Sequence, residues 1–496
     1  MTTMTERRED TVYFEAALRP ESGASMFAES AAAQTASLDQ LKPAPGLAER
    51  AASALQARGF TVRHVGTYSI SAEGPRSLWE STFNTHVEVR QAELTGRPPD
   101  VTSAAGAQVP YLSHVSGEPF TIPPDLEPYI ERAYPQAPPR FFAASPIPPR
   151  VGYHHLRVPD DVALLLRAHP VHDRGVTGRG VLVAMPDTGF YRHPFYDHHG
   201  YNYNATLAPD ATSVQHDEYG HGTAEAANIF ASARDIDFVG VKMGANPTLA
   251  FKAASDLSPA VMTNSWGFHL PNVTSLPNAL RPLELAVIEA VRERGIVVCF
   301  SAGNGHVAFP AMMPDVIAVG GVFVDETLST TTANGEFRME ASDYASSFDS
   351  LIYAGRHVPD VCGLVGKQPH AIYIMLPVEP GDEIDTSLAG PGYPNKDGTG
   401  KDDGWAVISG TSAASPQIAG VCALLKQAQP GLSPDLVKAI LKASARDVLD
   451  GKSAMGEVAT DGYDGPTGSG LVNAEAAYRL ARSVTPRNLH TLPPPR

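Results

Sequence analysis

The sequence predicts an α/β protein with its polar site residues at the carboxyl ends of buried strands, preceded by a small α+β domain. Two stretches predict the α/β part. The apolar run VLVAMPDTGF ends in a polar turn at Asp187, and WAVISGTSAASPQIAGVCALLKQAQP has the pattern of a strand, a turn and a buried helix. The α+β part is predicted by alternating segments and an amphipathic helix within residues 11–90.

The N-terminal part is composed of short elements. Strand-like composition or alternation marks three segments: 11–18, 60–70 and 86–90. Helical spacing marks two others: 46–59 and 75–83. In the longer helix Leu47, Ala51 and Leu55 are expected to face inward, and Gly59 is expected to end it. Helices that return to a small antiparallel sheet are typical of an α+β sandwich of the ferredoxin type.

Three short motifs supply the parts of an activated serine nucleophile. PDTG, GHGT and GTSAASP present Asp187, His221 and Ser412 at corners made of small residues. A serine hydroxyl is a weak nucleophile, and it needs a base within hydrogen-bond reach and a third group that orients the base. We therefore expect Ser412 to attack a carbonyl, His221 to take its proton and Asp187 to hold the imidazole. The chain order Asp, His, Ser differs from that of α/β-hydrolases and of chymotrypsin.

The local context suits each role. Asp187 is expected at the end of a strand, His221 in the first turn of a helix, and Ser412 at the start of another helix, where free N–H groups favour an anion. A further strand, GIVVCFSAGNG, leads to Asn304, whose side-chain amide can donate to an oxyanion together with the N–H of Ser412. The preceding run, VMTNSWGF, offers a strand edge to an extended peptide.

These five motifs together resemble those of the subtilisin-like serine peptidases, the subtilases. Each motif is weak alone, but all five follow the family's order within about residues 171–482. The resemblance implies a three-layer fold, in which a parallel sheet has helices on both faces, and an endopeptidase that acts on peptides or proteins. It implies Asp187, His221 and Ser412 as the triad, and Asn304 with Ser412 as the oxyanion hole. Six residues would flank the pocket for the substrate side chain: Ser265, Trp266, Gly267, Ser301, Ala302 and Gly303. Core packing is the alternative role for the tryptophan.

The resemblance also implies a domain organisation. Residues 171–482 would form the catalytic domain, with an insertion at about 326–404 whose β-type runs predict an added hairpin or sheet beside the cleft. Residues 1–132 are similar to prodomains of the related sedolisin group, which implies a zymogen with an intramolecular inhibitor; a permanent accessory domain is the alternative. Residues 133–170 would be a linker and lead-in whose first prolines forbid a helix, and 483–496 a tail.

Three positions depart from the family's usual pattern. Ala413 stands where Met is usual, Gln417 where His is usual, and Glu225 where Val is usual. None of these changes removes a catalytic group. Glu225 lies four residues after His221, and a carboxylate there is expected to alter the field at the base.

Two other functions use the same motifs. One is a non-catalytic module that captures peptides in its cleft, and the other is an esterase or amidase for small molecules. The intact set of four catalytic groups argues against the first, and the lack of a G-x-S-x-G turn around Ser412 disfavours a lipase-like esterase. Taken singly, each triad residue is equally explained as a strand end, a core histidine or a helix cap. Their joint order and context favour catalysis.

The composition argues against other classes. The chain of 496 residues has 38 Lys and Arg against 54 Asp and Glu, a net charge of −16 that disfavours nucleic acid and anionic membranes as partners. No apolar stretch approaches the length of a membrane span. The N-terminus lacks the apolar core of a signal peptide, so we expect a cytoplasmic protein, with secretion as the alternative. Three cysteines argue against a disulfide framework.

The predicted chemistry requires no cofactor and no catalytic metal. Because many subtilases bind calcium, the oxygen-rich loops at 381–385 and 395–404 are candidates for a structural calcium ion. Their spacing does not match a calcium-hand loop, and solvated acidic loops are the simpler explanation. The histidine-rich segment at 193–200 lacks the spacing of a zinc site.

Overall fold

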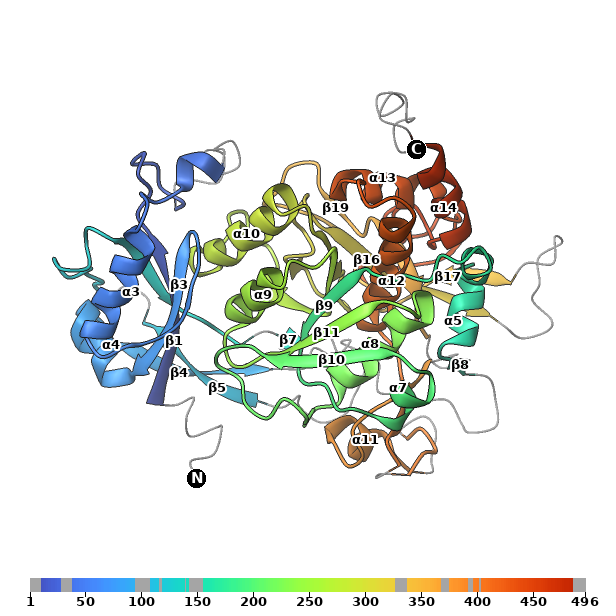
Figure 1. Cartoon of the computed structure of the whole chain (residues 1–496), viewed down its shortest axis with the longest axis horizontal. Helices are drawn as coiled ribbons and strands as arrows, with labels where there is room; N and C mark the ends of the chain where they lie inside the picture. The colour runs from blue at the N-terminus through green and yellow to red at the C-terminus, as the bar shows by residue number, and fades with distance from the viewer. Residues whose placement is uncertain are drawn as a thin grey trace.

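The computed structural model describes residues 10–27, 38–93, 108–115, 118–138, 140–141, 155–325, 337–366, 374–390, 396–400 and 403–484. Much of the proline-rich segment, parts of the expected insertion and the tail beyond residue 484 lie outside the described residues. The described residues form a small N-terminal domain and a larger α/β domain, which lie side by side (Figure 1).

The small domain is an antiparallel sheet with two helices. Its sheet strands and helices are, in chain order, β1 (Thr11–Leu18), α3 (Leu47–Ala57), β2 (Thr61–Val65), β3 (Ser69–Pro75), α4 (Arg76–Phe83) and β6 (Ile130–Pro135). The strand order β2-β3-β1-β6 is the βαββαβ arrangement of a ferredoxin-type sandwich. The three positions predicted to face inward on α3 are buried: Leu47, Ala51 and Leu55. β6 continues past the expected domain end at residue 132, because its Tyr134 pairs with Glu15 of β1.

The pleat of β1 separates this domain's own core from the surface that faces the other domain. Phe14 packs in an aromatic cluster with Phe60, Trp79 and Phe83, and its ring centroid lies 4.8 Å from that of Trp79. The next residue, Glu15, points to the opposite face of the sheet and is fully buried against the α/β domain. One strand thus serves both the folding of the small domain and its docking.

The strand expected at residues 86–90 forms, but in a separate hairpin. β4 (Val87–Glu93) pairs with β5 (Gln108–His114), and β6 takes the fourth place in the main sheet of the small domain. Alternation along a segment predicts a strand, but it does not identify the partner strand.

A mostly parallel sheet forms the middle layer of the α/β domain. Its strands among the described residues are β9 (Leu182–Asp187), β10 (Asn202–Leu207), β11 (Asp237–Lys242), β12 (Val261–Asn264), β14 (Val297–Ser301), β16 (Ile317–Asp325), β17 (Arg338–Ala341), β20 (Val361–Leu364) and β23 (Asp450–Gly451). The order is β10-β11-β9-β12-β14-β16-β17-β23, and β20 also pairs with β16. β17 is antiparallel to β16. Because β20 falls within the expected insertion, the main sheet takes up part of that segment.

Helices cover both faces of this sheet, which gives the expected three layers (Figure 1). One face packs against α8 (His221–Ser232), α12 (Thr411–Ala428), α13 (Pro434–Ser444) and α14 (Ala474–Ser483), and the other against α9 (Pro247–Asp256) and α10 (Arg281–Ile288). In β14, Val297 and Cys299 point into the first core, whereas Val298 and Phe300 point into the second. Burial on both faces explains the continuous apolar runs of these strands.

Shorter elements surround these layers. They are η1 (Leu38–Leu41), β7 (Arg140–Phe141), β8 (Leu156–Arg157), α5 (Asp160–Leu165), α6 (His169–His172), α7 (Pro194–His198), β13 (Trp266–His269), η2 (Asn278–Leu280), η3 (Glu289–Glu293), β15 (Ala308–Phe309), β18 (Phe348–Asp349), β19 (His357–Val358), β21 (Ile374–Pro377), α11 (Glu383–Leu388) and β22 (Trp405–Ile408). Within the expected insertion, β21 pairs with β22 and with β8, which gives a small added sheet.

Two helices that begin at predicted site residues pack directly on each other. A Cβ at Gly420 of α12 would lie 2.6 Å from the carbonyl oxygen of Ile229 and 2.6 Å from Cβ of Ser232 on α8. Nearer the helix starts, Gln417 of α12 donates to Asn228 of α8 at 3.1 Å. Gln417 precedes Gly420 on α12, and their partners on α8 follow in the same order, Asn228 before Ser232. The helices α8 and α12 therefore run in the same direction and start on the same side of the sheet.

Replacing Gly420 by valine should force these helices apart. We expect Gly420→Val to lower the free energy of unfolding by about 2–3 kcal/mol, because overpacking a close helix contact shifts backbone atoms. Urea unfolding would measure this, in a Ser412→Ala background that removes the expected nucleophile. Gly431→Val is the matched control, because a Cβ at Gly431 has no neighbour within 4 Å. Equal losses in both variants would contradict the packing argument.

Candidate active site

Asp187 and His221 meet at the carboxyl edge of the main sheet. Asp187 is the last residue of β9 and His221 the first of α8, as the sequence predicts. The Nδ1 atom of His221 lies 2.7 Å from Oδ1 of Asp187, and both side chains are buried. Gly222 permits this approach, because a Cβ there would lie 2.2 Å from the carbonyl oxygen of Gly189 and 3.0 Å from Cβ of Asp187.

A second aspartate braces the start of α8. Oδ2 of Asp217 accepts hydrogen bonds from the backbone N–H of Thr223 at 2.8 Å and from its hydroxyl at 2.7 Å. Oδ1 accepts from the hydroxyl of Thr188 at 2.7 Å, and that hydroxyl in turn accepts from the N–H of Gly222 at 3.0 Å. The N-terminal N–H groups of the helix that carries His221 therefore have fixed partners.

Ser412 lies in the first turn of α12, as expected. Pro416 stands four residues later in the same helix and has no N–H for the carbonyl of Ser412. The hydroxyl of Ser265 donates to that carbonyl instead, at 2.8 Å. The Ser412 hydroxyl in turn lies 3.5 Å from the carbonyl oxygen of Ser265. Ser265 thus fixes the turn that carries Ser412, a role that the sequence pattern did not indicate.

Asn304 is anchored to the turn that presents Ser412. Its Oδ1 accepts from the backbone N–H of Thr411 at 3.0 Å and from the Thr411 hydroxyl at 3.0 Å. A backbone N–H needs an acceptor, so this contact fixes the orientation of the amide and makes Nδ2 the donating atom on its other side. The hydroxyl of Thr411 also accepts from the N–H of Gly303 at 3.1 Å, which ties the end of β14 to the same turn.

The residues predicted to flank a substrate pocket occupy two neighbouring segments. Ser301 ends β14, Ala302 and Gly303 follow it, and all three are buried. Trp266 is also fully buried, and its Nε1 donates to the carbonyl of Pro186 at 3.1 Å, so its side chain is part of the core. The backbone of β13 nevertheless offers a pairing edge, because Trp266 and Gly267 pair antiparallel with residues 141 and 140 of β7.

The surroundings of His221 change the pKa of its side chain. Burial alone lowers the pKa of His221, but the negative charge and hydrogen bond of Asp187, with smaller contributions from Glu225 and Asp217, raise it to about 9. Burial raises the pKa of Glu225 to about 8, against the attraction of His221. Burial also raises the pKa of Asp217. The imidazole is therefore buried away from water and has several carboxyl groups around it.

Carboxylates of the oxygen-rich loops accept hydrogen bonds from their own backbone. Oδ2 of Asp385 accepts from the N–H of Gly381 at 2.8 Å, and Oδ1 of Asp382 accepts from the N–H of Asp385 at 2.7 Å. Among the described residues, no group of three or more His, Cys, Asp or Glu side chains is arranged to hold a metal ion.

The remaining sequence expectations concern cysteines and membranes. All three cysteines, Cys299, Cys362 and Cys422, are free and buried. No helix within the described ranges is long and apolar enough to cross a membrane. The cytoplasmic location stays a prediction.

The chain is similar to several known proteins. The model of the Subtilase family of peptidases (peptidase S8) matches residues 178–469. M-protease of Shouchella clausii strain KSM-K16 is 30% identical over 326 residues, which cover 63% of this chain and 68% of that protein. Subtilisin Savinase of Lederbergia lenta is 29% identical over 326 residues, 63% of this chain and 96% of that protein. The crystal structure of fervidolysin from Fervidobacterium pennivorans aligns with a TM-score of 0.49 and 17% identity, over 95% of this chain and 61% of that one.

The chain belongs to the Subtilase family, and it is a serine endopeptidase of the subtilisin type. An Asp-His-Ser triad is typical of this family. Sequence reasoning located the motifs, but it missed the brace formed by Asp217 and the role of Ser265 in holding the nucleophile turn. The one available signal for Asp217 was its position four residues before His221.

Proposed function

We propose that Asp187, His221 and Ser412 form the catalytic triad of this serine endopeptidase. The observation that carries the proposal is the contact of 2.7 Å between the buried side chains of Asp187 and His221. His221 begins α8, and Ser412 lies in the first turn of α12, which runs parallel to α8. A carboxylate on Nδ1 orients the imidazole so that Nε2 is the atom that accepts a proton.

The reaction then follows in balanced steps. The Oγ atom of Ser412 bonds to the carbonyl carbon of the peptide while its proton moves to Nε2 of His221. The C–N bond then breaks, the proton passes from Nε2 to the departing amine, and an acyl-enzyme remains. Water attacks this ester by the same route, which returns the proton to Ser412 and releases the acid.

We propose Asn304 and the N–H of Ser412 as the donors to the oxyanion. The amide orientation set by Thr411 makes Nδ2 of Asn304 a donor, and the N-terminal end of α12 adds the positive end of its dipole. Donors that are fixed before reaction stabilise the developing charge without reorganisation.

We propose that substrates bind as an extended strand along β13. The N-terminal part of the chain itself pairs with this strand at Trp266 and Gly267, which shows that the edge accepts an antiparallel partner. Ser265 adjoins this edge and contacts the Ser412 turn. The two segments 265–267 and 301–303 would then form the walls beside the scissile bond.

Phosphonylation of Ser412, in which its Oγ bonds to phosphorus and fluoride leaves, tests the triad directly. A fluorophosphonate probe should label the protein, and Ser412→Ala should abolish labelling and lower protein hydrolysis by roughly 10⁴-fold or more. Ser275→Ala, at an exposed serine of the same domain, is the control and should label normally. Turnover of small esters without turnover of casein would favour an esterase, and peptide binding without labelling would favour a binding module.

Loss of the Asn304 amide should slow turnover more than binding. We expect Asn304→Ala to reduce kcat by roughly 10²–10³-fold with little change in KM, a range taken from a subtilisin donor of this kind. Steady-state kinetics on a peptide substrate would measure both constants. Asn278→Ala, at an exposed asparagine, is the control. A change confined to KM would contradict the assignment.

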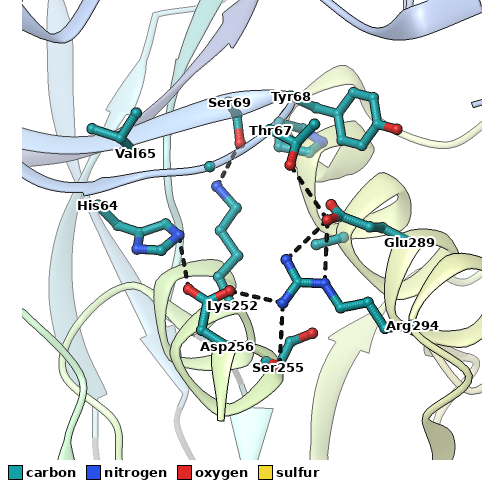
Figure 2. Close-up of a pocket in the computed structure, with 13 residues that line it drawn as sticks. His64, Val65, Thr67, Tyr68, Ser69, Lys252, Ser255, Asp256, Glu289 and Arg294 are labelled. Atoms are coloured by element: carbon teal, nitrogen blue, oxygen red, sulfur yellow. Dashed lines mark hydrogen bonds and ion pairs between the residues drawn. The ribbon is translucent and has the colours of Figure 1, made fainter. Parts of the chain in front are cut away.

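We further propose that the small domain is the inhibitory part of a zymogen. Its sheet docks on α9 and η3 through polar contacts (Figure 2) and on Leu285 of α10 through an apolar cluster of Ala17, Met26, Leu41 and Tyr68. Nζ of Lys252 on α9 lies 2.6 Å from Oε2 of Glu15 on β1, and Ser69 donates to the same oxygen at 2.8 Å. His64 of β2 also approaches Asp256, the last residue of α9, at 3.3 Å.

The chain that leaves the small domain supports the same proposal. After β6 it reaches β7, which lies antiparallel to β13 beside the Ser412 turn. A segment in this position occupies the edge that a substrate strand would use. Release of the domain would therefore require a break in the chain or the loss of this pairing.

Breaking the buried ion pair should activate the uncleaved protein. Glu15→Gln leaves Lys252 without its counter-charge in the interface and should weaken docking by about 3–5 kcal/mol. We expect faster hydrolysis of a short peptide by the intact chain, with mass spectrometry of the same sample reporting its N-terminus. Arg58→Gln, which breaks the solvent-exposed pair with Asp125 inside the small domain, is the control. Full wild-type activity with an intact N-terminus would contradict the zymogen proposal.

A further inference from the structure

One buried carboxyl group beside the base has no part in the mechanism above. Glu225 lies one helical turn after His221 on α8, and its side chain is fully buried. Its Oε1 lies 4.0 Å from Nε2 of His221, the ring nitrogen on the side away from Asp187. The imidazole therefore lies between two carboxyl groups, one near each nitrogen.

A buried network holds Glu225 in this position. Its Oε2 accepts from Nδ2 of Asn228 at 2.9 Å, and Oδ1 of Asn228 accepts from Nε2 of Gln417 at 3.1 Å. Gln417 also accepts from the N–H of Leu364 at 2.8 Å and donates to its carbonyl at 3.1 Å. The network joins α8, α12 and β20, and it links two of the residues that depart from the family pattern, Glu225 and Gln417.

The two carboxyl oxygens of Glu225 differ in their partners. Within the described part of the chain, Oε1 of Glu225 accepts no hydrogen bond. An ionised carboxylate in such a place is costly unless a cation stands near it. His221 becomes a cation in each catalytic cycle, when it holds the proton of Ser412.

Titration of the two groups is linked. The titratable groups that interact electrostatically with the pair are Asp187 on β9, Asp217 before α8, Tyr196 on α7 and Tyr344 after β17. The ring of Tyr219, before α8, lies 6.2 Å from that of His221. Because each group shifts the pKa of the other, their two titration steps belong to the pair rather than to either side chain alone.

We propose that Glu225 is a positioning residue that stabilises the imidazolium of His221 from the Nε2 side and sets the pH at which His221 becomes a base. Glu225 neither touches the substrate nor takes the serine proton. The inference rests on the proposed triad. It predicts that the acid limb of the pH profile, where kcat/KM rises with pH, lies at alkaline pH. Below this limb His221 is already protonated and cannot accept the proton of Ser412.

Glu225→Gln keeps the shape of the side chain and an acceptor for Asn228, but it removes the charge. The pKa of His221 should fall, so the acid limb of kcat/KM should move down by about one pH unit or more, as for a charge 4.0 Å away. On the alkaline plateau, kcat/KM should fall by a matching factor, about tenfold for each unit, because the same imidazolium loses its stabilisation in the transition state. A purely structural role would lower the plateau without moving the limb.

Two controls accompany this variant, with the active enzyme counted by fluorophosphonate titration. Glu225→Asp retains the charge on a shorter side chain and should keep the limb closer to that of the wild type. Glu218→Gln removes a carboxylate that is 70% exposed and paired with Lys242, and should leave the limb nearly unchanged.

The outcomes separate this inference from the proposed function. If the wild type shows no turnover that depends on Ser412, the proposed function fails. If the wild type is active and Glu225→Gln has the wild-type acid limb, this inference alone is wrong. A limb that moves equally in Glu225→Gln and Glu218→Gln would also overturn it, because a general change of surface charge would then explain the shift.

Discussion

The direct contact between α8 and α12 is the constraint on which the site depends. His221 and Ser412, the proposed base and nucleophile, belong to different helices that are far apart in the sequence, and each stands in the first turn of its helix. Gly420 lets the two helices approach until backbone and side chain touch, and both helices run the same way. A helix fixes the direction of its first residue only if its own axis is fixed, so the positions of His221 and Ser412 at the two helix starts depend on packing a few turns away.

Much of this arrangement could be predicted from the sequence, because its residues stand in short motifs at the ends of strands and the starts of helices. A buried strand that ends in Asp-Thr-Gly, or a helix that opens with His-Gly-Thr, leaves a pattern within ten or so residues. Asp187, His221, Ser412 and Asn304 all stand at the ends of elements predicted in this way. A general property of parallel sheets, in which functional side chains gather at the carboxyl edge, led us to expect these residues on one side of the sheet.

The remainder depends on contacts between distant residues and left no local pattern. Ser265 donates to the carbonyl that Pro416 leaves without a partner, and nothing in the SWG motif indicates this. β6 rather than β4 completes the small sheet, because pairing partners are chosen by the fold and not by alternation. The sequence identified Glu225 and Gln417 as departures, but only the structure shows that one hydrogen-bond network contains both.

The contact between the two domains is mixed in character, and this has a consequence for what remains if they part. The face of the α/β domain includes Lys252, Asn246, Asp256 and Leu285, whereas the small domain contributes the apolar side chains of Ala17, Met26, Leu41 and Tyr68. Polar groups become hydrated once the neighbour leaves, but apolar side chains that lose their cover favour association. The small domain would therefore be left with the face more prone to aggregate.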